Sequence, residues 1–158
     1  MKKVLIPGSF DPVTIGHYDV IERCARMFDE VYVVAFKNTE KSGKEMFGGK
    51  ESYEMLKITV KDLPNVHADI TDRLVVDYVR EKGIDFIVKG VRDTVDFEYE
   101  HDLFCINRDI GNVDTVFIPA SSEYKHISST FVRDMIKYGR DITPYVPKGV
   151  AEYIKTTV

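Results

Sequence analysis

The chain has 158 residues, the usual length of one domain, and its net charge of −4 at pH 7 argues against a nucleic-acid partner. Its residues are 44% apolar and 30% charged, as in ordinary globular proteins, so we expect a single domain over residues 1–158. Met1-Lys2-Lys3 leads directly into a short apolar run, and no long apolar helix follows, so we expect a cytoplasmic protein without a signal peptide or membrane contact.

Apolar runs alternate with helical patterns along the chain. The runs that predict buried strands are residues 4–6, 31–36, 66–70, 86–88 and 113–118. The helical patterns lie at residues 20–28, 50–61, 74–79, 97–106, 131–136 and 150–154. This alternation predicts an α/β, Rossmann-like fold: a five-stranded parallel sheet with helices on both faces. Cys24 and Cys105 lie within helical patterns, so we expect two buried, free thiols.

The first strand runs into a loop and a helix at residues 7–17, Pro-Gly-Ser-Phe-Asp-Pro-Val-Thr-Ile-Gly-His. Gly8 has no Cβ and would let the backbone pass close to a ligand. Thr14 is placed to cap the helix, which puts Gly16 and His17 in its first turn, where free N–H groups favour a phosphate. Such a loop is also common without any ligand, and its glycines match no dinucleotide or Walker fingerprint. This segment alone leaves both interpretations open.

Two cations follow the fourth predicted strand, where Lys89 and Arg92 flank Gly90. Because a cation is costly to bury in a sheet, we expect both side chains to project from a turn into the crevice at the strand's end. Lysine offers a point charge there and arginine a planar fork for phosphate oxygens. The alternative is a solvated turn.

Hydroxyls and carboxylates mark two further helix starts. Residues 127–130, Ile-Ser-Ser-Thr, carry more hydroxyls than a helix cap needs, and predict a second anion-binding site. Tyr124 and His126 would then line a base pocket, or be ordinary packed side chains. The acidic run at residues 96–100 either compensates a helix dipole or holds a ribose hydroxyl. His67 and His101 match no metal-binding pattern, and we expect no protein-held metal.

All these loops follow strands, so they should meet at the carboxyl edge of the sheet, where α/β folds bind ligands. Two anion-binding helix starts with nearby cations indicate an extended polyphosphate. No Ser-His-Asp or Cys-His arrangement supplies a covalent nucleophile. The chemistry that needs only positioning and charge stabilisation is direct in-line transfer at phosphorus.

These motifs resemble, in order and over essentially the whole chain, those of bacterial phosphopantetheine adenylyltransferases, a family of the nucleotidylyltransferase superfamily. The resemblance rests on the loop at residues 7–17, the turn at 89–92, Asp-Phe-Glu-Tyr-Glu at 96–100 and Ile-Ser-Ser-Thr at 127–130. It implies a nucleotidylyltransferase fold and the reaction of ATP with 4′-phosphopantetheine, assisted by Mg²⁺, to give dephospho-coenzyme A and pyrophosphate. It also implies a homohexamer with feedback by coenzyme A.

The resemblance further implies roles for individual residues. His17 would stabilise the charge that develops at the attacked phosphorus. The implied catalytic set is His17, Lys41, Arg92 and Ser129. The residues implied to bind ATP are Ser9, Phe10, His17, Gly90, Val91, Arg92, Glu100, Tyr124, Lys125, His126, Ile127, Ser128, Ser129 and Thr130. The residues implied to bind phosphopantetheine are Ser9, Lys41, Leu74, Val75 and Lys89.

The chain departs from the family pattern at three places. The loop that carries Lys41 looks longer than usual, which makes Lys44 a rival for the substrate lysine. Gly-Gly-Lys-Glu-Ser stands at residues 48–52 in place of Leu-Glu-Glu-Arg, and Lys125-His126 replaces a more usual Ser-Phe. Two other functions remain open: nucleotidyl transfer to another acceptor, such as nicotinamide mononucleotide or a polyol phosphate, and non-catalytic nucleotide sensing.

Overall fold

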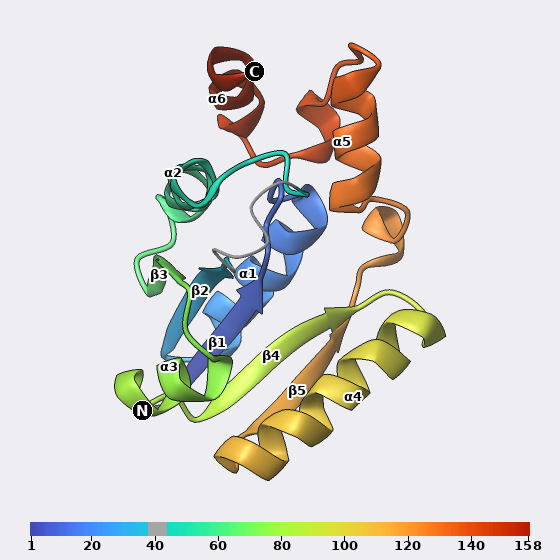
Figure 1. Cartoon of the computed structure of the whole chain (residues 1–158). Helices are drawn as coiled ribbons and strands as arrows, with labels where there is room; N and C mark the ends of the chain where they lie inside the picture. Colours follow the sequence, from blue (N-terminus) through green and yellow to red (C-terminus); the bar gives the residue numbers. More distant parts are fainter. Residues whose placement is uncertain (38–43) are drawn as a thin grey trace.

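A computed structural model describes residues 1–37 and 44–158, in which strands and helices alternate along the chain (Figure 1). The strands are β1 (Lys3–Gly8), β2 (Glu30–Phe36), β3 (Val66–Thr71), β4 (Phe86–Val91) and β5 (Asp114–Pro119). The α-helices are α1 (Ile15–Met27), α2 (Gly49–Val60), α3 (Val75–Lys82), α4 (Thr94–Gly111), α5 (Ser129–Lys137) and α6 (Val150–Thr157). Two 3₁₀ turns, η2 (Ser122–Tyr124) and η3 (Thr143–Tyr145), flank α5. Each predicted strand and helix is present in this part of the chain.

Within the described residues, the five strands form one parallel sheet in the order β3-β2-β1-β4-β5. The chain order reverses between β1 and β4, where α/β sheets bind ligands at the carboxyl edge. There the β1–β4 ladder holds only two residue pairs, Val4 with Phe86 and Leu5 with Ile87, whereas the neighbouring ladders hold six. The two strands therefore part before their carboxyl ends and leave room between them.

Both faces of the sheet are covered by helices, as predicted. On one face, Val4, Val31 and Val33 pack with buried side chains of α1, α2, α5 and α6. On the other face, Leu5 and Ile87 pack with side chains of α3. The longest helix, α4, contacts β4, β5 and α3 (Figure 1). Among the described residues, no helix has both the length and the apolarity needed to cross a membrane.

Helix ends follow from local sequence. Thr14 caps α1 and Ser128 caps α5, each through its hydroxyl oxygen, which accepts a backbone N–H three residues on. Gly83 ends α3 with φ of +64°, a left-handed conformation that glycine adopts at no steric cost. The predicted caps at Thr14 and Gly83 are thus confirmed.

Two expectations are wrong. Lys89 lies within β4, where it pairs with Phe117, and not in a turn after the strand. Its charge is tolerated there because Glu100 on α4 supplies a counter-charge. Cys24 is buried, but Cys105 is exposed. On a helix of 3.6 residues per turn Cys105 lies about 140° from the buried Glu100, and so faces away from the sheet.

Candidate active site

A cavity of about 670 Å³ opens at the carboxyl edge of the sheet, between the loop after β1, the end of β4, α4 and the start of α5. The site residues suggested by the sequence that line it are Ser9, Phe10, His17, Val75, Lys89, Gly90, Arg92, Glu100, Tyr124, Ile127, Ser128, Ser129 and Thr130. The suggested residues outside its lining are Leu74, Val91, Lys125 and His126. Lys41 lies outside the described residues, and Lys44 is exposed.

The first turn of α1 fixes the imidazole of His17. The His17 backbone N–H donates to Thr14 Oγ1 at 3.3 Å, and the Thr14 backbone N–H donates to His17 Nδ1 at 2.9 Å. This reciprocal arrangement is a capping box in which histidine takes the place of the usual glutamate. Because Nδ1 accepts a backbone N–H, the proton of the neutral ring is carried on Nε2.

The charge state of His17 follows from its surroundings. Burial is the main cause that lowers the pKa of His17 to about 4, and the positive charges of Lys89 and Arg92 lower it further. The ring of Phe10 packs edge-on against the imidazole, with centroids 5.0 Å apart. At neutral pH His17 therefore presents an uncharged hydrogen-bond donor in the lining of the cavity.

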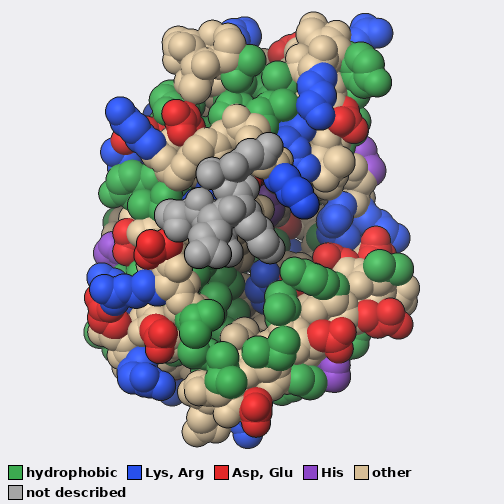
Figure 2. Space-filling view, in the orientation of Figure 1, with side chains coloured by type: hydrophobic (Ala, Val, Ile, Leu, Met, Phe, Trp, Pro, Cys, Tyr) green, Lys and Arg blue, Asp and Glu red, His purple; other side chains and the backbone are tan. Residues whose placement is uncertain are grey.

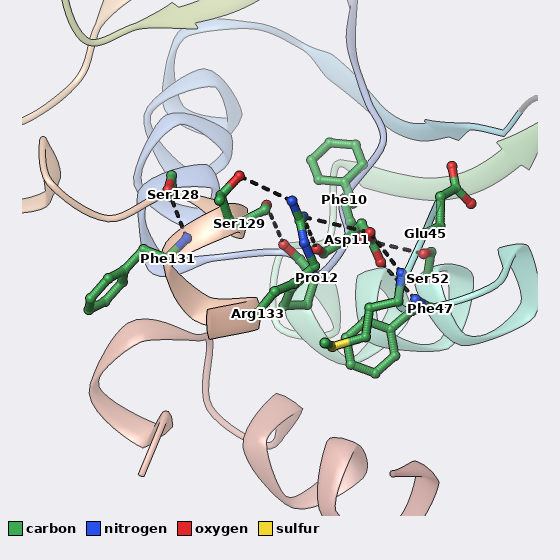
Figure 3. A network of polar contacts seen from close by, with 12 residues as sticks. Phe10, Asp11, Pro12, Glu45, Phe47, Ser52, Ser128, Ser129, Phe131 and Arg133 are labelled. Atoms are coloured by element: carbon green, nitrogen blue, oxygen red, sulfur yellow. Dashed lines mark hydrogen bonds and ion pairs between the residues drawn. The ribbon is translucent and has the colours of Figure 1, made fainter. Parts of the chain in front are cut away.

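The loop between β1 and α1 is held by its carbonyl groups (Figure 3). Ser52 Oγ donates to Phe10 O at 3.2 Å, Arg133 Nη1 to Asp11 O at 2.7 Å, and Ser129 Oγ to Pro12 O at 2.7 Å. The loop is thus tied to α2 and to α5 at three successive residues. These ties hold Phe10 in the left-handed region, with φ of +47°, a conformation that few residues other than glycine adopt.

Gly8 makes room for a neighbouring side chain, a role that the sequence did not indicate. A Cβ at Gly8 would lie 3.0 Å from the Phe10 ring, so the missing side chain makes room for that ring, which in turn packs on His17.

The start of α5 brings both backbone N–H groups and side-chain hydroxyls to the cavity. Ser128 Oγ accepts the Phe131 N–H at 3.0 Å, and Ser129 Oγ is bonded to Pro12. Thr130 Oγ1 accepts Arg133 Nη2–H at 3.1 Å, so all three hydroxyls have a partner within the protein. The first N–H groups of a helix have no acceptor within it, so those of Ser129 and Thr130 are the donors that this helix start offers an anion.

Two ion pairs line the opposite wall. Lys89 Nζ lies 3.2 Å from Glu100 Oε1 and also donates to Pro7 O at 3.4 Å. Burial raises the pKa of Glu100, an effect that Lys89 opposes. Arg92 Nε lies 3.9 Å from Asp96 Oδ2, and this carboxylate also accepts the Arg92 backbone N–H at 3.0 Å. Each cation is therefore held by a carboxylate from α4.

The cavity also has a largely apolar part between the sheet and α4. Leu103, Phe104 and Asn107 line it from one side of α4, with Val75 from the start of α3. Leu103 and Phe104 belong to the helical stripe read in the sequence, but their exposure to a cavity could not be foreseen. The wall that carries Lys89 and Arg92 thus continues into a space suited to an elongated, mostly apolar ligand with few polar groups.

The chain has relatives in known protein families. Residues 5–135 match the family model described as cytidylyltransferase-like. A phosphopantetheine adenylyltransferase of Symbiobacterium thermophilum is 44% identical over 98% of this chain and 95% of its own length. A phosphopantetheine adenylyltransferase of Aquifex aeolicus is 43% identical over 96% of this chain and 95% of its own length. The fold also resembles Plasmodium falciparum nicotinic acid mononucleotide adenylyltransferase complexed with NaAD, with a TM-score of 0.70 and 16% identity over 99% of this chain and 96% of that one.

The charge state of His17 gives a direct test. We expect the imidazole to titrate with a pKa of about 4 in an NMR pH titration, and hence to stay neutral at physiological pH. Lys89→Met and Arg92→Met should each raise this pKa, since each removes a positive charge that opposes protonation. A wild-type pKa near the ordinary histidine value would contradict a neutral donor at this position.

Proposed function

The chain belongs to the phosphopantetheine adenylyltransferases, within the cytidylyltransferase-like family, and transfers an adenylyl group to 4′-phosphopantetheine in coenzyme A biosynthesis; we propose that it does so by direct in-line transfer in the cavity at the carboxyl edge. An oxygen of the acceptor phosphate forms the new bond to the α-phosphorus of ATP. The bond from that phosphorus to the bridging oxygen breaks, and pyrophosphate leaves with the electron pair.

The observation that carries this mechanism is the neutral His17 beside two cations and a helix start. Its Nε2–H would donate to an α-phosphate oxygen as negative charge builds up in the transition state. A neutral donor adds no fixed charge that would retain pyrophosphate. Arg92 and the first N–H groups of α5 would hold the β- and γ-phosphates, with no covalent step on the protein.

The two ends of the cavity suggest where each substrate binds. We propose that ATP lies along the lining residues Ser9, Phe10, Gly90, Arg92, Tyr124 and 127–130, with Glu100 near the ribose. The acceptor phosphate lies near Ser9 and Lys89, and the pantetheine arm extends along Val75 into the apolar part beside α4. Ser9 then lies where the two substrates meet.

The residues fit a Mg²⁺ ion that arrives with ATP. The carboxylates that line the cavity, Asp96 and Glu100, are each paired with a cation. In the part of the chain that is described, no group of three or more His, Cys, Asp or Glu side chains could hold a metal. Phosphate oxygens and water are therefore the expected ligands, and the ion would neutralise charge on the leaving pyrophosphate.

The role of His17 is tested by a substitution that keeps the helix cap. His17→Asn retains an acceptor where Nδ1 stood but removes the Nε2–H donor. We expect kcat for pyrophosphate release to fall about 100- to 1,000-fold, with ATP affinity little changed, because the lost contact forms mainly in the transition state.

The wild-type control uses a panel of acceptors. Pyrophosphate should be released with 4′-phosphopantetheine and not with nicotinamide mononucleotide or a polyol phosphate. Preference for another acceptor would overturn the substrate assignment, and ATP binding with no turnover on any acceptor would favour a sensor. Retained turnover in His17→Asn would overturn the proposed role of the imidazole.

Lys41 and Lys44 can be separated by matched substitutions. We propose that Lys41 binds the acceptor phosphate. Lys41→Met should therefore raise the KM for phosphopantetheine and lower kcat/KM about 10-fold or more, as expected when a charge-assisted contact is lost. Lys44→Met, three residues on, is the control and should leave both constants unchanged. The reverse result would transfer the role to Lys44.

We also propose that the exposed face of α4 contributes to contacts between copies in a homohexamer. This helix has 18 residues, of which only Glu100 is buried. Large apolar side chains gather over it (Figure 2), and the exposed ones that share one side of the helix are Val95, Tyr99, Ile106 and Ile110. An apolar surface of this kind is typical of a protein contact.

Sedimentation velocity tests this assembly. The wild type should sediment as a hexamer, and Ile106→Glu should shift it to smaller species because a charge would be buried in the contact. Tyr138→Glu, at an exposed site just after α5, is the control and should leave the hexamer intact. A monomeric wild type would contradict the proposal.

A further inference from the structure

Arg133 joins two parts of the site that are far apart in sequence. It lies one helical turn after Thr130 on α5, lines the cavity, and its side chain is 26% exposed. Nη1 donates to Asp11 O at 2.7 Å, and Nη2 donates to Thr130 Oγ1 at 3.1 Å. One guanidinium thus binds the loop after β1 and the first turn of α5 at the same time (Figure 3).

Asp11 extends this connection to a third segment. Its residue is 5% exposed, and its carboxylate Oδ2 lies 3.6 Å from Arg133 Nη1. The same carboxylate accepts the backbone N–H of Met46 at 3.1 Å and that of Phe47 at 2.8 Å, just before α2. A buried carboxylate needs a counter-charge and hydrogen-bond donors, and Arg133 is its ion-pair partner among the described residues.

We propose that Arg133 is a positioning residue for adenylyl transfer, which fixes the loop before the His17 helix relative to the start of α5. The two helix starts must face one triphosphate, and the imidazole must lie beside the phosphorus between them. A shift of about 1 Å at such a site can cost about 100-fold in rate. This inference rests on the proposed function.

The geometry of the contacts explains why arginine is needed. A guanidinium is a rigid planar fork that can serve acceptors on two segments together, whereas a lysine ammonium is a point charge on a flexible stem. Ser129 Oγ makes a second, parallel tie between α5 and the same loop, at Pro12 O. Arg133 and Ser129 should therefore act as a coupled pair.

The test compares steady-state kinetics of Arg133→Met, Arg133→Lys and the control Arg140→Met, an exposed arginine just after the same helix. We expect Arg133→Met to lower kcat about 100-fold and to raise the KM for ATP. Arg133→Lys keeps the counter-charge for Asp11, so it should fold and show a KM for ATP close to wild type, but a kcat lowered about 10-fold. Arg140→Met should match wild type.

Two outcomes would overturn the proposal. If the kcat of Arg133→Lys equals that of the wild type, Arg133 supplies only a positive charge. If Arg133→Met matches Arg140→Met once the folded fraction is measured by circular dichroism, the residue only stabilises the fold. The double variant Arg133→Met/Ser129→Ala should lose less than the sum of the two separate losses in transition-state free energy, because both ties hold one loop.

Failure of the proposed function would appear separately. It would show as absent wild-type turnover with phosphopantetheine, before any variant is compared. The positioning role would then be judged by calorimetric ATP affinity, which Arg133→Met should weaken and Arg140→Met should not. Equal affinity of these two variants would overturn it.

Discussion

The active site depends on one reciprocal contact, in which Thr14 and His17 cap each other at the start of α1. The backbone N–H of Thr14 occupies Nδ1 and so decides which ring nitrogen carries the proton. Burial and two nearby cations then keep the ring uncharged. The same contact thus sets both the helix start and the protonation of the ring, because the residue that closes the first turn of the helix is also the donor that we propose for the ligand.

The sheet topology gives this donor its surroundings. Since β1 and β4 part after two residue pairs, the loop after β1 and the end of β4 face each other across a gap. The carboxylates of α4 hold the cations of β4 on one side of this gap, and α5 closes the other side with its N-terminus. The arrangement places positive charge and helix N–H groups around one volume while Lys89 and Arg92 each keep a carboxylate partner.

Features that depend on neighbouring residues could be predicted from the sequence. The strands and the caps at Thr14 and Gly83 are of this kind, since periodicity and turn chemistry act over a few residues. The meeting of the loops at the carboxyl edge follows once the strands are taken as parallel. The position of Lys89 within β4 was not predicted, because its counter-charge comes from a separate helix. The hydrogen bonds of Ser129 and Arg133 to the loop after β1 span 117 and 122 residues, and no local sequence pattern predicts them.

The engagement of Ser129 Oγ with Pro12 O has a consequence for how this site can change during evolution. With that hydroxyl occupied inside the protein, the groups that α5 turns toward an anion include main-chain amides. Every amino acid except proline brings the same amide, so substitution at these positions leaves the donors in place. A ligand that binds these two amides therefore makes contacts that no point mutation other than one to proline deletes.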